Sequence, residues 1–250
     1  MQVERLLQGV RDLLEPDLRG AYLHGSAVLG GGGPRSDIDV IAVAARRTTA
    51  DEKRRLVDLL LNVSRQPSPI EFDLVVESEI RPWRHPAPFD FHYDELVRER
   101  FESGALEPWP EPTNRDLAAV VTMVLAGNVS LFGPPPAEVF EPVPRRDYLD
   151  ALLRNVEMAD EWLDWDTRNV VLTLPRVWAG VATDDVHSKQ SAAAWTLARL
   201  PEEHRAVLER AVAIYRGERD EFWDDIRPQV RAYADYVLSE ISSAIRTAST

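Results

Sequence analysis

The hydrophobic periodicity of the chain changes once, and this change constrains the fold more than any other sequence feature. Up to residue 76, segments with helical spacing alternate with short apolar runs, whereas the pattern from Arg115 onward is helical. Alternating helices and strands form a sheet with helices packed against it, and consecutive helices form a bundle. We therefore expect an α/β (α+β) protein of two domains, with a small mixed sheet in residues 1–141 and an all-helical bundle in residues 142–250.

The elements expected in the first half follow the order helix, strand, strand, helix, strand. Apolar residues at helical spacing predict a first helix, and Pro16 follows near its end. The alternation of side chains predicts that Asp37 and Asp39 point to one face of their strand, while Glu71 and Asp73 share a face of the next. The predicted strands cover residues 21–24, 37–43 and 70–76, and the second predicted helix covers residues 56–63.

Two proline-rich segments interrupt this regular pattern. Residues 81–112 predict an ordered excursion with only a short helix near 94–103, and the glycine run at 30–34 predicts a flexible turn. Residues 133–144 separate the mixed part from the helical part, which places the domain boundary near Glu141. The later helices are expected around residues 147–163, 167–182, 189–199, 202–216 and 219–247.

The composition limits the partners and the location of the protein. The chain has no cysteine, which excludes disulfides and thiolate chemistry and leaves oxygen and imidazole as metal ligands. The N-terminal residues resemble an amphipathic helix, not a signal peptide, and no stretch reaches transmembrane length, so we expect a cytoplasmic protein that does not associate with a membrane. The net charge of −13 repels nucleic acid and attracts cationic substrates, although acidity alone also serves solubility.

The stretch LHGSAVLGGGGPRSDIDVIAV carries the chemistry. Gly25 permits a tight turn that brings backbone N–H groups and the Ser26 hydroxyl toward a phosphate. Asp37 and Asp39 follow on one face, and Glu71 or Asp73 on the next strand can complete an acidic cluster. Clustered carboxylates repel one another unless a cation lies among them. Each part alone is also typical of an ordinary turn or a polar strand edge, but the combination predicts a divalent metal site.

The expected chemistry follows from this arrangement. Mg²⁺ bound by carboxylates orients a triphosphate and offsets the charge that develops as pyrophosphate leaves. A carboxylate near the acceptor hydroxyl can take its proton, and Glu71 is the predicted base. The five histidines include no pair at metal-ligand spacing on a predicted helix, which argues against zinc. His24, beside the Gly-Ser turn, is expected to serve strand packing in preference to phosphate contact.

The order Gly-Ser, spacer, Asp-x-Asp resembles the nucleotidyltransferase superfamily that includes DNA polymerase beta and kanamycin nucleotidyltransferase. A closer resemblance, over almost the whole chain, is to the aminoglycoside (3'')(9)-adenylyltransferase family. It rests further on the stretches IRPWRHPA, LFGPPPAEVFEPVP, RNVVLTLPRVWAGV, HSKQSAAAWTLARLP and AVAIYRGE. The resemblance implies a nucleotidyltransferase fold and Mg²⁺-dependent transfer of AMP from ATP to a hydroxyl of spectinomycin, streptomycin or both, which gives antibiotic resistance.

The resemblance also implies the roles of individual residues. Ser26 and Ser36 match phosphate contacts, and Asp37 and Asp39 match metal ligands. Glu71 matches the catalytic base and is also expected to bind the metal. In the helical part, three positions match a triphosphate-binding lysine, a nucleotide contact and an acid of the cleft between the domains: Lys189, Tyr215 and Asp166. ATP and substrate would meet between the two domains.

The departures from the family concern the substrate. Leu96 stands where the family has a substrate-stacking tryptophan. The family's tryptophan and aspartate before RNVVLTL are also not cleanly kept. In DEWLDWDTRN, Trp162, Asp164 or Trp165 could replace them only if the alignment is shifted. Aromatic faces beside carboxylates suit an aminocyclitol cation, although a solvated helix end explains them equally well. Spectinomycin alone or another small alcohol therefore remains open. Two further alternatives are transfer of AMP to a protein and a non-catalytic nucleotide-binding module; we expect a monomer.

Overall fold

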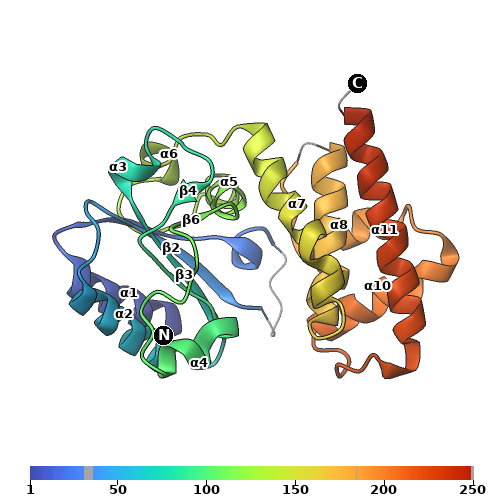
Figure 1. The fold of residues 1–250 in the computed structure, drawn as a ribbon, viewed down its shortest axis with the longest axis horizontal. Helices are drawn as coiled ribbons and strands as arrows, with labels where there is room; N and C mark the ends of the chain where they lie inside the picture. Colours follow the sequence, from blue (N-terminus) through green and yellow to red (C-terminus); the bar gives the residue numbers. More distant parts are fainter. Residues whose placement is uncertain (31–35, 184, 249–250) are drawn as a thin grey trace. The chain divides into compact units, whose positions relative to one another are not determined.

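The computed structural model describes residues 1–30, 36–183 and 185–248. The chain forms two compact units, Met1–Val28 with Ser36–Asp147 and the chain from Tyr148 onward. The predicted class is confirmed, since one unit contains a mixed sheet with helices and the other is helical (Figure 1). The predicted boundary after Glu141 stays a prediction, because compactness does not test which segments fold independently. The predicted glycine turn falls mainly on residues 31–34, which lie outside the described residues.

The sheet of the N-terminal unit has the strand order β5-β3-β2-β1-β7. The pair β2 and β3 is parallel, and the other neighbours are antiparallel, so the sheet is mixed as predicted. A separate short pair joins β4 to β6. The strands are β1 (Leu18–Leu23), β2 (Ile38–Ala44), β3 (Ile70–Val76), β4 (Ala87–Pro88), β5 (Phe91–Tyr93), β6 (Thr113–Asn114) and β7 (Ser130–Phe132).

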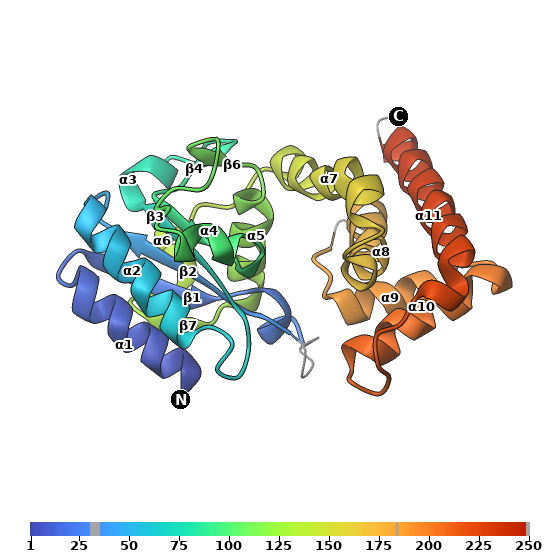
Figure 2. The same cartoon turned by 60° about the horizontal axis from the view of Figure 1, so that its bottom comes forward.

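Helices cover both faces of the sheet, and two apolar cores fill the space between. On one face, α1 (Gln2–Leu14) and α2 (Ala50–Val63) lie side by side and pack on Val40 and Ala42 (Figures 1 and 2). On the other face, α5 (Leu117–Gly127) packs on Ile41 and Val43. The alternation predicted for β2 is therefore confirmed. The short elements of this unit are η1 (Gly25–Ala27), α3 (Glu77–Ile80), η2 (Glu95–Val97), α4 (Arg98–Glu102) and α6 (Pro136–Val139).

Helix α2 starts earlier than its apolar stripe, because a capping box fixes its first turn. The Thr49 side chain accepts a hydrogen bond from the Glu52 backbone at 3.2 Å, and the Glu52 carboxylate accepts one from the Thr49 backbone at 2.7 Å. This pair satisfies two N–H groups that have no partner inside the helix. The predicted helix, which began at residue 56, was therefore too short, because it left out the polar first turns from Ala50.

Three expectations for chain segments were incomplete or wrong. Residues 81–112 include the strand β5 at the edge of the main sheet, and β7 adds the strand at the opposite edge. Both are three residues long, too short to show a period of two in the sequence. The helix predicted from residue 219 begins at Arg227, after the short η3 (Asp224–Ile226). Pro228 fits this start, because proline is tolerated in the first helical turn.

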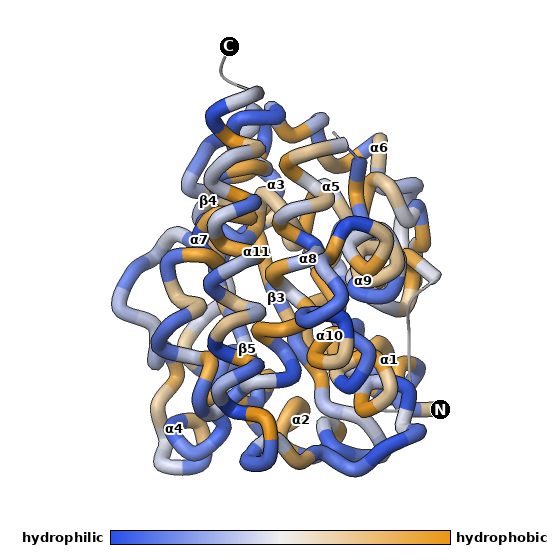
Figure 3. The backbone as a smooth tube through the Cα atoms, turned by 90° about the vertical axis from the view of Figure 1, so that its right-hand side faces the viewer, coloured by the Kyte–Doolittle hydropathy of each residue, from blue (hydrophilic) through white to orange (hydrophobic). Residues whose placement is uncertain are grey.

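The helical unit is organised around a buried helix. Helix α8 is apolar around most of its circumference and packs against α9, α10 and α11. Along the neighbouring helices, hydrophobic and hydrophilic residues alternate along the tube (Figure 3), as expected when one face is buried. In the described part of the chain, no helix is both long and apolar enough to cross a membrane. The helices are α7 (Arg145–Trp162), α8 (Thr167–Thr183), α9 (Lys189–Leu197), α10 (Glu202–Tyr215) and α11 (Arg227–Ala248).

Candidate active site

Strand register brings polar side chains from three strands to one face of the sheet. The parallel ladder pairs Asp39 with Glu71 and Ile41 with Asp73, and the antiparallel ladder pairs Asp73 with His92. Residues that are paired across strands point to the same side of a sheet. The acids predicted to lie together are therefore neighbours on β2 and β3, and His92 on β5 extends the group.

The Gly-Ser turn packs directly against one of these acids. Gly25 begins η1 with φ of +63°, and a Cβ atom at this position would lie 1.9 Å from Oδ2 of Asp39. The backbone N–H of His24 donates to the carbonyl oxygen of Asp39 at 3.1 Å. Only glycine allows both this backbone conformation and this close approach. Ser26 follows and is partly exposed, and Ser36 and Asp37 directly precede β2.

The carboxylates around Glu71 raise its pKa. Burial raises the pKa of Glu71 well above its usual range, and the charges of Asp39, Asp73, Asp94 and Asp37 raise it further. Concentrated negative charge of this kind is relieved by a cation or by a bound proton. The oxygen donors of Asp37, Asp39 and Glu71 are those that a hard divalent ion prefers. These residues therefore fit a site for a hard divalent ion such as Mg²⁺.

Sequence analysis did not identify His92 as a site residue. Its Nδ1 lies 2.8 Å from Oδ1 of Asp73, and one donor atom from each of Glu71, Asp73 and His92 lies within 4.8 Å of the others. Burial lowers the pKa of His92, but the hydrogen bond to Asp73 and the charges of Asp73, Asp94 and Asp116 together outweigh burial, and the pKa is raised. His24 is buried as well, and burial lowers its pKa to about 4. No sequence signal pairs His92 with Asp73, because the contact requires β5 to join the sheet.

A second polar group lies in the helical unit. The Lys189 ammonium donates to Oδ1 of Asn169 at 2.5 Å. Burial raises the pKa of Asp166, while a hydrogen bond from Asn169 and the charge of Lys189 oppose the rise. The structure thus brings together two predicted residues, Lys189 and Asp166, and adds Asn169, which sequence analysis missed. Tyr215 is buried at the end of α10.

Of the three predicted apolar substrate residues, Leu96 and Trp165 are exposed and Trp162 is half-buried. Leu96 in η2 is 63% exposed, and its backbone N–H donates to the Asp94 side chain at 2.8 Å. In the helical unit, Trp165 is 57% exposed and meets Trp162 edge to face, with ring centroids 6.1 Å apart. Large apolar side chains in such positions are suited to contact a ligand.

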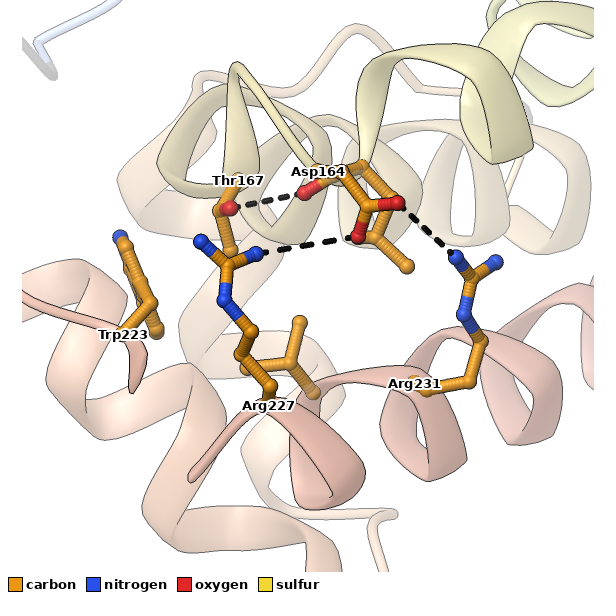
Figure 4. A pocket seen from close by; sticks show the side chains of 7 residues that line it. Asp164, Thr167, Trp223, Arg227 and Arg231 are labelled. Carbon is orange, nitrogen blue, oxygen red and sulfur yellow. Dashed lines mark hydrogen bonds and ion pairs between the residues drawn. The ribbon is translucent and has the colours of Figure 1, made fainter. Parts of the chain in front are cut away.

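Asp164, weighed as a substitute substrate contact, is engaged in ion pairs. It lies between Arg227 and Arg231 of α11, with N···O distances of 3.8 and 3.7 Å (Figure 4). The adjoining pocket, which Thr167 and Trp223 also line, has a volume of about 20 Å³, enough for one water molecule. This pocket is too small for a drug-sized ligand. Asp164, whose side chain is 74% exposed, joins the turn before α8 to α11 through these two ion pairs.

Comparison with known proteins agrees with this geometry. Residues 3–102 match the family model of the nucleotidyltransferase domain, so the turn and the acids belong to an enzyme of the nucleotidyltransferase class. Residues 138–240 match the model described as the C-terminal domain of aminoglycoside adenylyltransferase.

Relatives with known names narrow the class. A spectinomycin 9-adenylyltransferase of Staphylococcus aureus is 34% identical over 251 residues, which cover 98% of this chain and 95% of that protein. An aminoglycoside (3'') (9) adenylyltransferase of Escherichia coli is 33% identical over 252 residues, with the same coverage. The crystal structure of the spectinomycin adenyltransferase AAD(9) from Enterococcus faecialis with ATP and spectinomycin matches with a TM-score of 0.87 at 27% identity, covering 96% of this chain and 98% of that one. The chain belongs to the aminoglycoside adenylyltransferase family.

Proposed function

We propose that this protein transfers AMP from ATP to a hydroxyl of an aminocyclitol antibiotic, releases pyrophosphate and thereby gives resistance. Spectinomycin is the first candidate acceptor and streptomycin the second. The observation that carries the proposal is the contact of the Gly25 turn with Asp39, which is paired in turn with Glu71. The names of the full-length relatives support the antibiotic as acceptor.

The nucleotide would be held by residues from both parts of the chain. Gly25 and Ser26 at the start of η1, with Ser36, are the proposed phosphate contacts, since they offer N–H and hydroxyl donors at a turn. Lys189 is the proposed triphosphate lysine, since its ammonium group, which donates to Asn169, is the kind of cation that pairs with phosphate oxygens. Tyr215 is the proposed further nucleotide contact.

Glu71 is the proposed catalytic base, and it would hold Mg²⁺ together with Asp37 and Asp39. When bound, Mg²⁺ neutralises these acids and stabilises charge on the phosphate oxygens. The acceptor hydroxyl then attacks the α-phosphorus of ATP, its proton passes to the Glu71 carboxylate, and the bond to pyrophosphate breaks. Without the metal, burial and the neighbouring acids raise the pKa of Glu71. Bound Mg²⁺ would offset the charge of those acids and keep Glu71 ionised, as a base must be.

The proposed substrate contacts combine apolar and acidic side chains. Leu96, Trp162 and Trp165 offer accessible apolar surface, and Asp166 offers a carboxylate to an ammonium group. An aromatic face and a carboxylate both attract a cation. The net charge of −13 acts in the same direction at longer range.

The first experiment measures pyrophosphate release from MgATP with spectinomycin, streptomycin, kanamycin or no acceptor. Release with spectinomycin supports the proposal, and release with streptomycin as well shows that Leu96 does not prevent its use. Silence with every antibiotic, together with label transfer from ATP to a protein band, would replace the antibiotic by a protein substrate. Silence in both assays would favour a non-catalytic nucleotide-binding module. A single mass near 28.3 kDa in light scattering checks the proposed monomer.

The role of Glu71 is tested by Glu71→Gln, which keeps the shape of the side chain but removes the base. We expect transfer to fall about 10³-fold while MgATP still binds, within the range that general bases contribute. Glu99→Gln on the exposed side of α4 is the matched control and should retain wild-type activity. Near-normal transfer by Glu71→Gln would assign the base to another residue.

A further inference from the structure

A second group of side chains that could bind a metal lies next to Asp39 and Glu71. It consists of Asp73, two residues further along β3, and His92, its partner on β5. We propose that Asp73 and His92, completed by Glu71, bind a transition-metal dication of the Zn²⁺ class. This site is separate from the Mg²⁺ site of Asp37 and Asp39, with Glu71 common to both. The inference does not depend on the transfer reaction, because it concerns occupancy by a metal ion.

The geometry is close to that of a metal site. Oδ1 of Asp73 and Nδ1 of His92 lie 2.8 Å apart, and all three donor atoms lie within 4.8 Å of one another. Ligand atoms around a tetrahedral zinc ion are separated by roughly 3.3 Å, given metal–ligand bonds of about 2.0–2.1 Å. Asp73 and His92 are therefore near this spacing already. A rotation of the Glu71 carboxylate toward them would complete three protein ligands.

Two buried side chains at this site carry polar atoms that have no hydrogen-bond partner in the described part of the chain. Asp73 is 1% exposed, and its Oδ2 has no partner among the described residues. His24 is 2% exposed, and neither ring nitrogen has a partner there. A buried carboxylate oxygen without a partner is costly, so it points to a cation that the protein takes up.

Strand pairing places His24 on the same face of the sheet. Leu23 pairs with Val40, and the backbone of His24 bonds to Asp39, which continues the ladder by one residue. His24 is therefore a candidate for the fourth ligand position, which water fills otherwise.

The donor set selects the class of metal. Imidazole is a poor ligand for Mg²⁺ and Ca²⁺, whereas Zn²⁺, Co²⁺ and Fe²⁺ accept imidazole together with carboxylates. The surroundings also hold His92 in place. Trp109 donates from its ring N–H to the backbone carbonyl of His92 at 3.1 Å, and the two rings meet edge to face with centroids 4.4 Å apart. A fixed imidazole is what a metal site requires of its outer contacts.

Sequence analysis argued against zinc because no two histidines have helical ligand spacing. That argument covers only sites built on one helix. Here the ligands come from β3 and β5, and the antiparallel register brings them together. Since the chain has no cysteine, a site of carboxylates and imidazole is the form that a transition-metal site can take.

The test uses the full chain, stripped with EDTA and titrated with Co²⁺ in the absence of ATP. We expect one equivalent to bind, with visible absorption typical of low-coordinate Co²⁺, and Zn²⁺ to displace it. His92→Gln should weaken Co²⁺ binding at least tenfold. Asp37→Asn, in the proposed Mg²⁺ site, and His204→Gln, in the helical unit, should bind within threefold of wild type. Equal binding by His92→Gln, or loss of binding in Asp37→Asn, would overturn the assignment.

A folding control keeps this test decisive. Thermal unfolding of the metal-free variants establishes that they fold. If His92→Gln does not fold, Asp73→Asn takes its place in the titration. Wild-type protein with labelled histidines gives an independent measurement, since bound Co²⁺ should shift the imidazole signal of His92 and leave that of His204 unchanged. Unshifted histidine signals at saturating Co²⁺ would refute the site without any variant. These measurements report metal binding and not AMP transfer. A failure of the proposed function would be detected separately, in the pyrophosphate assay.

Discussion

Replacement of Gly25 by alanine tests whether the turn controls the position of Asp39. Gly25 has φ of +63°, and its added Cβ would lie 1.9 Å from Oδ2 of Asp39, whereas ordinary contacts begin at 3.4 Å. The contact is thus about 1.5 Å too short. Either the Asp39 carboxylate moves by more than 1 Å or the turn opens.

Two costs combine in this variant. A left-handed backbone at a residue with a side chain costs roughly 1–2 kcal/mol, and relief of the overlap costs about 1–3 kcal/mol in a packed site. We therefore expect a loss of unfolding free energy of about 2–5 kcal/mol from their sum. A misplacement of about 1 Å in a catalytic group can cost roughly 10²-fold in rate. Transfer should fall by that factor or more in the fraction that remains folded.

The matched control is Gly104→Ala. Gly104 also has a positive φ, +94°, but an added Cβ meets nothing within 4 Å. This variant should lose only the backbone contribution and keep full activity. Denaturant unfolding and pyrophosphate release, measured on both variants, separate the two contributions. If Gly25→Ala were as active as Gly104→Ala, Asp39 would not need its observed position and the assigned nucleotide turn would be wrong.

Three further predictions concern pH, substrate and stability. Burial lowers the pKa of His24 from 6.5 to about 4, so between these values the unfolded chain is protonated at His24 while the folded protein is not. The free energy of unfolding in EDTA should therefore fall by about 3 kcal/mol more in wild type than in His24→Gln as the pH drops from 7 to below 4, and parallel stability curves for the two proteins would contradict this. Leu96→Trp adds an aromatic face at an exposed position and should raise kcat/KM for streptomycin about 2–10-fold, the equivalent of one stacking contact. If the ratio of kcat/KM for streptomycin to that for spectinomycin did not change, residue 96 would not contact the substrate. Thr49→Ala removes one half of the capping box and should cost about 1 kcal/mol in thermal unfolding with unchanged transfer, whereas an unaltered Tm would show that the cap contributes nothing.

The parts of the fold that were predictable are those with local signals. The faces of β2 follow from strict alternation, and the order from α1 to β3 follows from changes of period and from turn residues. The strand β5 has only three residues and lies among prolines, so its pairing with β3 is decided by tertiary contacts. The start of α11 at Arg227 was likewise hidden, because residues 219–223 are compatible with a helix locally.

The candidate site divides along the same line. Gly25, Asp37 and Asp39 lie within one short stretch, and Glu71 sits on the next predicted strand, so chain order and alternation were enough to bring them together. Asn169 beside Lys189 could not be predicted, since the contact depends on how α8 meets α9. The pairing of Asp73 with His92 was equally inaccessible, because alternation fixes the face of each residue but not the neighbour of its strand.

The position of Asp73 in the ladder is the strongest physical argument that this face does more than carry the proposed Mg²⁺ ligands. Its partner Ile41 and the next residue in that row, Tyr22, are completely buried among apolar side chains, so the row belongs to the core. A buried carboxylate with incomplete partners costs several kcal/mol, a large part of a total stability of about 5–15 kcal/mol. His92 satisfies one oxygen, and a valine at position 73 would remove the whole cost. A ligand for the second oxygen would offset this cost, and the adjacent imidazole fits the proposed transition-metal ion.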